Sequence, residues 1–252
     1  MFNFGGMLTG AEIERQIKKG RIDISPYDSS CLNPNSYNLK LHPQLLIYKR
    51  GGDRTELLPK FKSNSNELNE ELNENNVNET DYEFIDNIND VIEAKILNSK
   101  IKSYTYGETI SALQSKFNDT EKLEPLDMKK DNEIIEFTIP EEGYVLQPGV
   151  LYIGRTIERT FSDKFIPMIN GRSSGGRLGI SIHVCAGFGD IGFDGTWTLE
   201  ITAVEPVRIY ANTEIAQVCY FSPYGKIKKL YRGRYYKQED ATASRFYKSK
   251  EY

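Results

Sequence analysis

Residues 171–200 read GRSSGGRLGISIHVCAGFGDIGFDGTWTLE, in which two glycine-rich turns are followed by an alternating strand. In the first turn, Arg172 and Arg177 supply forked cationic donors, and the glycines allow a close backbone approach to a ligand. Ser173 and Ser174 add short hydroxyl donors. This set suits a di- or triphosphate, although a surface turn with a structural arginine would use the same residue types.

The second turn and the strand carry acidic residues. Of Asp190 and Asp194, one can cap the turn and the other can hold a sugar hydroxyl or a water. In the strand, Glu200 shares its face with two threonines, because the side chains of a strand alternate between its faces. That pattern is typical of a solvated sheet face. In a closed site, the same carboxylate would serve as a proton shuttle.

The sequence on both sides of this stretch reads as short β-strands. The segments IIEFTI, YVLQ, VLYIGRTIERT and KFIPMING precede it, and PVRIYA and AQVCYF follow it, with glycine, proline and aspartate turns between them. Strands at intervals of about ten residues predict an all-β barrel or sandwich. No βαβ alternation is visible, so GRSSGGR is neither a Walker loop nor a Rossmann turn.

The N-terminal region predicts one helix and further strands. Thr9 is a candidate N-cap, Glu12 completes the pattern of a capping box, and Gly20 is a stop signal. The segments RIDIS and SYNLKLHPQLLIYK then alternate as strands do. The polar segment NPNSYNL at 33–39 is most simply a structural turn that leads into a strand.

Residues 52–130 differ in character from the rest of the chain. The segment SNSNELNEELNENNVNET is poor in apolar residues, so it cannot bury enough surface to offset chain entropy, and it predicts a mobile acidic loop. The following DYEFIDNINDVIEAKILNSK has apolar residues at helical spacing and predicts a helix. We therefore expect a partly disordered, partly helical insertion. An insertion without chemistry is the simpler interpretation, and a lid or partner-binding element is the alternative.

The composition excludes several classes of protein. The 252 residues carry a net charge of −4, which gives no strong attraction to nucleic acid or anionic membranes, and no apolar run is long enough to span a membrane. Three separated cysteines and the lack of a signal-peptide core indicate a reducing cytoplasm. With only two histidines and no C-x-x-C, a zinc site is not expected.

The tail at 223–252 is basic and rich in tyrosine. It is most simply a flexible C-terminal arm. Its lysines, arginines and aromatic rings would also suit a lid that closes on an anionic, aromatic ligand.

Four motifs in order give the chain a family resemblance: NPNSYNL, GRSSGGRLG, HVCAGFGDIGFDGTWTLE and, in the tail, YKQEDATASR. They resemble the dCTP deaminases of the dUTPase-like superfamily, from Met7 to Arg245 except for the insertion between roughly Gly51 and Leu126. The resemblance implies a mainly β, dUTPase-like distorted β-barrel or jelly-roll with an N-terminal helix, formed by residues 1–252 as a single domain. It also implies a homotrimer with its sites between subunits.

The same resemblance assigns roles to individual residues. Glu200 would shuttle the proton, while Ser173 and Arg177 would help to hold Glu200 and the catalytic water. The implied substrate-binding residues are Arg172, Ser173, Ser174, Gly175, Gly176 and Arg177 at the triphosphate, Asp190 at the deoxyribose, Thr198, Leu199 and Glu200 at the base, and Tyr231, Arg234 and Gln238 from the tail. Arg234 stands where the family has a lysine. Tyr224 competes for the role of the tail tyrosine, which we assign to Tyr231.

The implied reaction is the hydrolytic deamination of dCTP, with Mg²⁺ bound through the triphosphate and no zinc. The H-x-E and P-C-x-x-C signature of zinc deaminases is missing. Ala186 is followed by Gly187 and Phe188, where deaminases that stop at dUTP often have a His-Arg pair. The chain therefore looks more like the bifunctional members, which release dUMP, ammonia and pyrophosphate. The nucleotides dUTP and dTTP are further candidate ligands, although Cys185 replaces the usual threonine of the segment associated with dTTP feedback.

Three alternatives stay open: a deaminase that stops at dUTP, a plain dUTPase, and a non-catalytic nucleotide-binding relative. A dUTPase carries no acid at the position of Glu200, and the glycine-rich C-terminal motif of dUTPases is missing here. The presence of Glu200, Ser173 and Arg177 argues against lost catalysis. Neither nucleic acid nor a membrane is expected as a partner.

Overall fold

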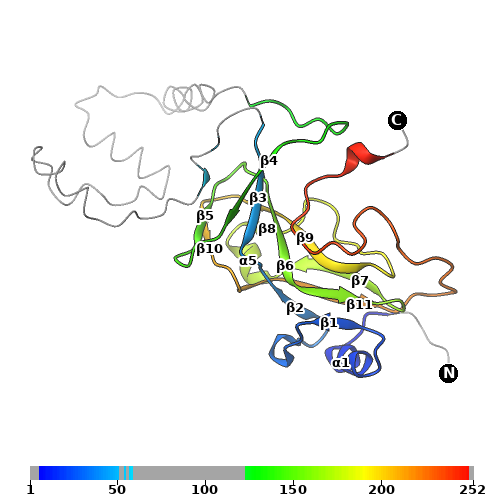
Figure 1. The fold of residues 1–252 in the computed structure, drawn as a ribbon. Helices are drawn as coiled ribbons and strands as arrows, with labels where there is room; N and C mark the ends of the chain where they lie inside the picture. Colours follow the sequence, from blue (N-terminus) through cyan, green and yellow to red (C-terminus); the bar gives the residue numbers. More distant parts are fainter. Residues whose placement is uncertain (1–5, 51–53, 55–56, 59–122, 250–252) are drawn as a thin grey trace, which may run out of the picture. The chain divides into compact units, whose positions relative to one another are not determined.

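The computed structural model describes residues 6–50, 54, 57–58 and 123–249 (Figure 1). The chain divides into two compact units, Met1–Leu57 with Pro125–Tyr252, and Leu58–Glu124. The described residues belong almost entirely to the first unit. The insertion expected at 52–130 lies outside the described residues except near its ends, and the helix expected within it lies outside them altogether.

The described part of the chain is mainly β, which confirms the predicted fold class. The strands are β1 (Asp23–Ser25), β2 (Tyr37–Lys40), β3 (Gln44–Tyr48), β4 (Ile134–Thr138), β5 (Tyr144–Leu146), β6 (Tyr152–Phe161), β7 (Ile166–Gly171), β8 (Ile180–Ser181), β9 (Asp194–Ala203), β10 (Val207–Ile209) and β11 (Glu214–Phe221). The helical segments are α1 (Gly10–Lys18), η1 (Ser29–Cys31), α5 (Ser173–Arg177) and η3 (Phe246–Lys248).

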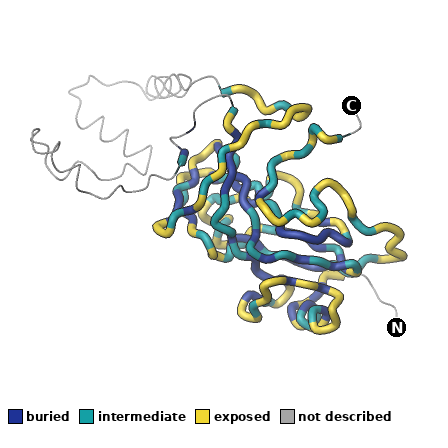
Figure 2. The backbone as a smooth tube through the Cα atoms, in the orientation of Figure 1, coloured by how far each residue is buried: buried dark blue, intermediate teal, exposed yellow. Residues whose placement is uncertain are grey.

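The strands form antiparallel sheets around one main core. The largest sheet has the order β4-β3-β6-β9-β8, and β1 pairs with the end of β6. A second sheet has the order β2-β11-β7, and a third joins β10 to β5. Figure 2 shows the buried residues concentrated along these strands. In β9 the alternation is as predicted, because Leu199, Ile201 and Ala203 are buried in the core while Glu200 is half-buried on the other face.

The N-terminal helix begins and ends at the predicted residues. The Thr9 hydroxyl accepts a hydrogen bond from the backbone N–H of Glu12 at 3.3 Å, and Gly20 follows the helix with φ of 65°. The reciprocal half of the capping box does not form. Instead, the carboxylate of Glu12 accepts hydrogen bonds from Arg15 at 2.6 and 2.7 Å, because a charged partner one turn along the helix competes with the backbone.

The GRSSGGR segment, expected to be a glycine-rich turn, forms a short α-helix of five residues. Arg172 is extended at the end of β7, and α5 follows at once. The N–H of Gly176 donates to the carbonyl of Arg172 at 3.0 Å, which closes a single helical turn. Glycines weaken a helix but do not prevent one turn of it.

The C-terminal tail makes backbone and side-chain hydrogen bonds with the sheet. Gln238 forms a parallel bridge with Gly195 of β9, and its carbonyl accepts the N–H of Thr196 at 3.0 Å. Further along, the N–H of Ala241 donates to the side chain of Gln44 at 3.0 Å, and the N–H of Ser244 donates to the hydroxyl of Tyr48 at 3.0 Å. The tail is thereby fastened across β9 and β3.

Candidate active site

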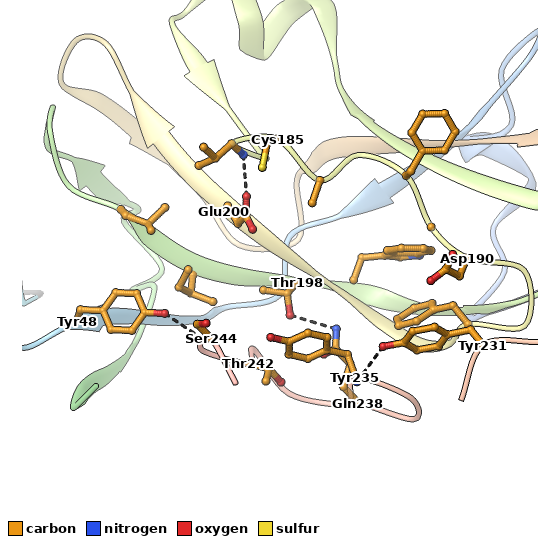
Figure 3. Close-up of a pocket in the computed structure, with 18 of the residues that line it drawn as sticks. Tyr48, Cys185, Asp190, Thr198, Glu200, Tyr231, Tyr235, Gln238, Thr242 and Ser244 are labelled. Atoms are coloured by element: carbon orange, nitrogen blue, oxygen red, sulfur yellow. Dashed lines mark hydrogen bonds between the residues drawn. The ribbon is translucent and has the colours of Figure 1, made fainter. Parts of the chain in front are cut away.

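A pocket of about 530 Å³ lies between β9, the loop that follows β8, and the C-terminal tail (Figure 3). Glu200 and Thr198 line it from β9, with Asp190 and Tyr231 toward one end and Tyr48 toward the other. The remaining lining residues are Leu126, Leu151, Ile153, Val184, Cys185, Ala186, Phe188, Gly189, Phe193, Trp197, Tyr235, Gln238, Thr242 and Ser244. Residues far apart in the sequence thus converge on one concave surface, which is the usual form of a small-molecule site.

Glu200 is held in a fixed orientation in the pocket wall. Its Oε2 accepts a hydrogen bond from the backbone N–H of Val184 at 2.7 Å. Its own N–H donates to the carbonyl of Ile182 at 2.9 Å, so the chain after β8 runs alongside β9 at this point. The carboxylate is therefore fixed through one oxygen and borders the pocket, which argues against the solvated sheet face that was the simplest sequence-based interpretation.

Gln238 and Thr198 form a polar pair beside Glu200. The Nε2 of Gln238 donates to the carbonyl of Thr196 at 2.9 Å and to the hydroxyl of Thr198 at 3.1 Å. Because a carbonyl only accepts, this contact fixes which end of the amide is nitrogen. The Oε1 of Gln238 is buried and has no partner among the described residues. It is an unused hydrogen-bond acceptor in a side chain that lines the pocket.

Aromatic rings form the end of the pocket near Asp190. The ring centroids of Phe193 and Trp197 are 4.3 Å apart, and those of Phe193 and Tyr231 are 6.1 Å apart. A side chain at Gly189 would collide with the Trp197 ring, so the turn can pass over the ring only with glycine. Asp194, the other candidate acid of this turn, forms an ion pair with Arg159 and does not line the pocket.

At an irregularity in β6, a side chain of this strand hydrogen-bonds the backbone of β9. The register between β6 and β9 shifts between Arg155 and Arg159, and within that shift the hydroxyl of Thr156 accepts the N–H of Trp197 at 3.0 Å. The same hydroxyl donates to the carbonyl of Glu158 at 2.8 Å. The Glu158 side chain is 2% exposed and accepts the N–H of Lys40 at 2.8 Å, and its burial raises the pKa of the carboxyl. These bonds fix the strand that carries Thr198 and Glu200.

The structure brings together Asp190, Thr198, Glu200, Tyr231 and Gln238 of the predicted site. The competing Tyr224 is 95% exposed and does not line the pocket. The phosphate-binding residues predicted at α5, which are Arg172, Ser173, Ser174, Gly175, Gly176 and Arg177, do not line the pocket of their own chain.

Two further predicted site residues are also placed apart from the pocket. The Leu199 side chain is 0% exposed and packs in the core, so it points away from the pocket, and only the backbone of Leu199 could contact a ligand there. Arg234 is exposed, and its Nη2 donates to the hydroxyl of Ser249 at 2.6 Å.

Several lining residues were not predicted from the sequence. Tyr48 and Ile153 belong to a small apolar cluster with Leu46 and Ala241, separate from the main core. The signal was present in the wholly apolar end of β3, LLIY, because such a run indicates a strand covered on both faces. Ile153 pairs directly with Glu200 across the sheet, so correct strand pairing would have placed it beside the acid.

The described residues bring no group of three or more histidines, cysteines, aspartates or glutamates into a geometry that could hold a metal ion. Among these same residues, no helix has the length and apolar character needed to cross a membrane.

Comparison with known proteins shows the family of the chain. A family model described as dCTP deaminase-like matches residues 85–222. A protein of Hathewaya histolytica named "dCTP deaminase, dUMP-forming" is 39% identical over 91% of this chain and 90% of its own. One of the same name from Clostridium acetobutylicum is 36% identical over 96% and 97%. A solved 2′-deoxycytidine 5′-triphosphate deaminase from Agrobacterium tumefaciens aligns with 87% of this chain and 49% of its own, at 15% identity and a TM-score of 0.46. The chain belongs to the dCTP deaminase family.

Proposed function

We propose that this protein deaminates dCTP and also cleaves the triphosphate, so that its products are dUMP, ammonia and pyrophosphate. One observation carries the proposal: the carboxylate of Glu200 borders the pocket and is fixed through one oxygen by the N–H of Val184 at 2.7 Å. An oriented carboxylate next to a base-sized pocket can move protons during hydrolysis. The names of the relatives support the dUMP-forming version over a deaminase that stops at dUTP.

The chemistry requires one water for each bond that is cleaved. In the first step, Glu200 takes a proton from water while the oxygen attacks C4 of cytosine. Glu200 then returns the proton to the amino group, and ammonia leaves. The hydroxyl now on C4 gives its proton to N3, which yields the uracil nucleotide. In the second step, another water attacks the α-phosphorus, and pyrophosphate leaves to give dUMP. Serine and arginine side chains of α5, Ser173 and Arg177, would hold the first water and the phosphates.

The pocket offers matching groups for the rest of the nucleoside. The Oε1 of Gln238 is buried without a partner among the described residues, and a small rotation of the amide toward the pocket would let it accept a hydrogen bond from the exocyclic amine of cytosine. The carbonyl of uracil at that position offers no proton. Asp190 would bind the deoxyribose hydroxyl, and Tyr231 would cover the sugar or base from the tail. The strand segment at Thr198 and Leu199 would read the base through its backbone and the threonine hydroxyl.

The position of α5 supports a homotrimer with shared sites. The cationic helix does not line the pocket of its own chain, so a complete site needs α5 from another chain or a movement of α5 toward the pocket. Large apolar side chains near α5 and the pocket rim are exposed, namely Leu178, Val184, Phe188 and Val204. Exposed apolar residues of this kind mark contact surfaces. Light scattering during size exclusion would give three times the 28.8 kDa chain mass for a trimer.

Mg²⁺ is proposed as the companion of the triphosphate. The residues of α5 include no carboxylate, so the ion would be held by phosphate oxygens and water, with its charge balancing that of the phosphates. The nucleotides dUTP, as the uracil form, and dTTP, as a regulator, are proposed further ligands. A cytoplasmic location is proposed from the unpaired cysteines.

The products of dCTP turnover with Mg²⁺, followed over time by chromatography, test the proposal. We expect dUMP and pyrophosphate to rise together with ammonia, without a lag. Accumulation of dUTP would refute the coupled reaction, and turnover of dUTP without any turnover of dCTP would refute deamination.

The variant Glu200→Gln tests the proton shuttle itself. It should lower ammonia release by about 10³-fold or more, because an amide cannot accept and return the proton. Nucleotide binding should survive, since the amide oxygen can still accept the Val184 N–H. Ammonia release at the wild-type rate by this variant would remove Glu200 from the mechanism.

A further inference from the structure

We infer that Glu214 is a positioning residue for Arg172, and that hydrogen bonds from the NPNSYNL segment hold Glu214 in place. The inference rests on the proposed function, because it takes Arg172 to be a phosphate-binding residue. It gives a role to Glu214, which the sequence had not singled out, and to a motif that the proposed mechanism leaves unused.

Arg172 is held by Glu214 through a single nitrogen. Its Nη1 contacts Oε2 of Glu214 at 2.6 Å and donates to the carbonyl of the same residue at 3.2 Å. Both side chains are half-buried. The hydrogen bond and the ion pair that the Arg172 side chain makes with other described residues both use Nη1, so Nη2 and Nε are left for a ligand. An arginine held by one edge presents its other donors in a fixed fork.

Glu214 is in turn anchored by the NPNSYNL segment. Its Oε2 accepts a hydrogen bond from Nδ2 of Asn38 at 2.8 Å. The Oδ1 of Asn38 accepts from Nδ2 of Asn33 at 2.7 Å, so the amide of Asn38 is held at both ends. The thiol of Cys31 lies 3.6 Å from Oε1 of Glu214. Charged and hydrogen-bonded groups that satisfy each other in this way form a rigid network.

A second chain of bonds reaches the residue before Arg172. The hydroxyl of Ser36 donates to Oε1 of Gln217 at 2.7 Å, and Nε2 of Gln217 donates to the carbonyl of Gly171 at 3.0 Å. In the sheet, Gln217 pairs with Asn38 on one side and the neighbouring Ala216 pairs with Gly171 on the other. Two side chains of β11 therefore fix the backbone and the side chain at the start of α5.

Positioning and simple electrostatics predict opposite results when Glu214 loses its charge. A carboxylate near a phosphate site repels the phosphates, so its removal would strengthen binding if charge alone mattered. If Glu214 holds Arg172 in place, an amide at position 214 leaves only a weaker, uncharged hydrogen bond to the guanidinium, so binding weakens. The sign of the change therefore separates the two explanations.

The test compares Glu214→Gln, Arg172→Ala and the double variant with the wild type, using dCTP turnover and the binding of inorganic tripolyphosphate by calorimetry. We expect Glu214→Gln to raise the KM for dCTP and the Kd for tripolyphosphate about tenfold, with a smaller change in kcat. In the Arg172→Ala background, the same change should have no further effect, because the two residues act as one unit. The matched control is Glu14→Gln, which neutralises the carboxylate of a surface ion pair with Lys18 at 2.9 Å and should change neither constant.

Three outcomes would overturn the inference: an unchanged or lower Kd in Glu214→Gln, an equal loss in the Arg172→Ala background, or an equal loss in the control. If Glu214→Gln does not assemble, Glu214→Asp replaces it, since the shorter side chain keeps the charge but cannot reach Arg172. A similar rise in Kd is then expected, and no rise would count against positioning. Failure of the wild type to turn over dCTP would refute the proposed function, while tripolyphosphate binding would still test the role of Glu214.

Discussion

Two inactive variants should restore activity to each other when they are mixed. Glu200 lines the pocket, whereas Arg177 is exposed on α5 and does not line the pocket of its own chain. If each site takes Glu200 from one chain and Arg177 from another, a trimer of mixed Glu200→Gln and Arg177→Ala chains contains intact sites. Each chain is of either kind with equal chance, so about one quarter of the sites receive both functional residues.

The assay is ammonia release from dCTP by the two variants, separately and after unfolding and refolding together in equal amounts. We expect the mixture to reach about one quarter of the wild-type rate, far above the mean of the two parents. The matched control mixes Glu200→Gln with Gln238→Ala. Both of these residues line the pocket of one chain, so that mixture should not exceed the mean of its parents. No recovery in the first mixture, with trimers present, would refute the shared site.

Three further predictions concern the residues around the pocket. Burial raises the pKa of Glu158, so the folded protein loses stability as the pH rises from the pKa of this carboxyl in the unfolded chain through its pKa in the folded protein. Glu158→Gln should therefore raise the thermal unfolding midpoint above that of the wild type at pH 7.5 but not at pH 4. An equal difference at both pH values would contradict this. Tyr231→Phe removes the hydroxyl that accepts the N–H of Tyr235 at 3.1 Å and should raise the KM for dCTP by about 2- to 10-fold, while Tyr224→Phe in steady-state assays should leave it unchanged. Gly192 has φ of 89°, and an added Cβ would lie 2.7 Å from Leu230. Gly192→Ala should therefore lower the free energy of unfolding by about 1–3 kcal/mol in denaturant titrations. An unchanged free energy of unfolding would mean that the tail can move aside.

The strands were predictable because their pattern is local. Alternation in β9 placed Glu200 on the face opposite Leu199, and the structure has that arrangement. Turn residues between strands marked their ends, and Thr9 with Gly20 marked the first helix. These signals depend on neighbours in the sequence, so no knowledge of the tertiary structure was needed.

The features that were missed depend on contacts between distant segments. The path of the tail is set by hydrogen bonds to Gln44 and Tyr48, which composition does not reveal. The anchoring of Arg172 by Glu214 joins residues 42 positions apart. The roles assigned to α5 came from a family resemblance and not from the residues alone, since a glycine-rich segment with two arginines is equally typical of a surface turn.

The hydrogen bond from the Val184 N–H makes the two carboxylate oxygens of Glu200 unequal. Oε2 accepts a backbone N–H at 2.7 Å, whereas Oε1 accepts no hydrogen bond from the described residues and is the less encumbered oxygen for proton exchange. In the proposed reaction, the proton taken from water and the proton given to the leaving amine therefore pass through one atom. The attacking water and the departing ammonia must both lie within reach of that atom, on the same side of the cytosine ring. In the proposed reaction, the backbone of Val184 would thus help to set the face of the base that water attacks.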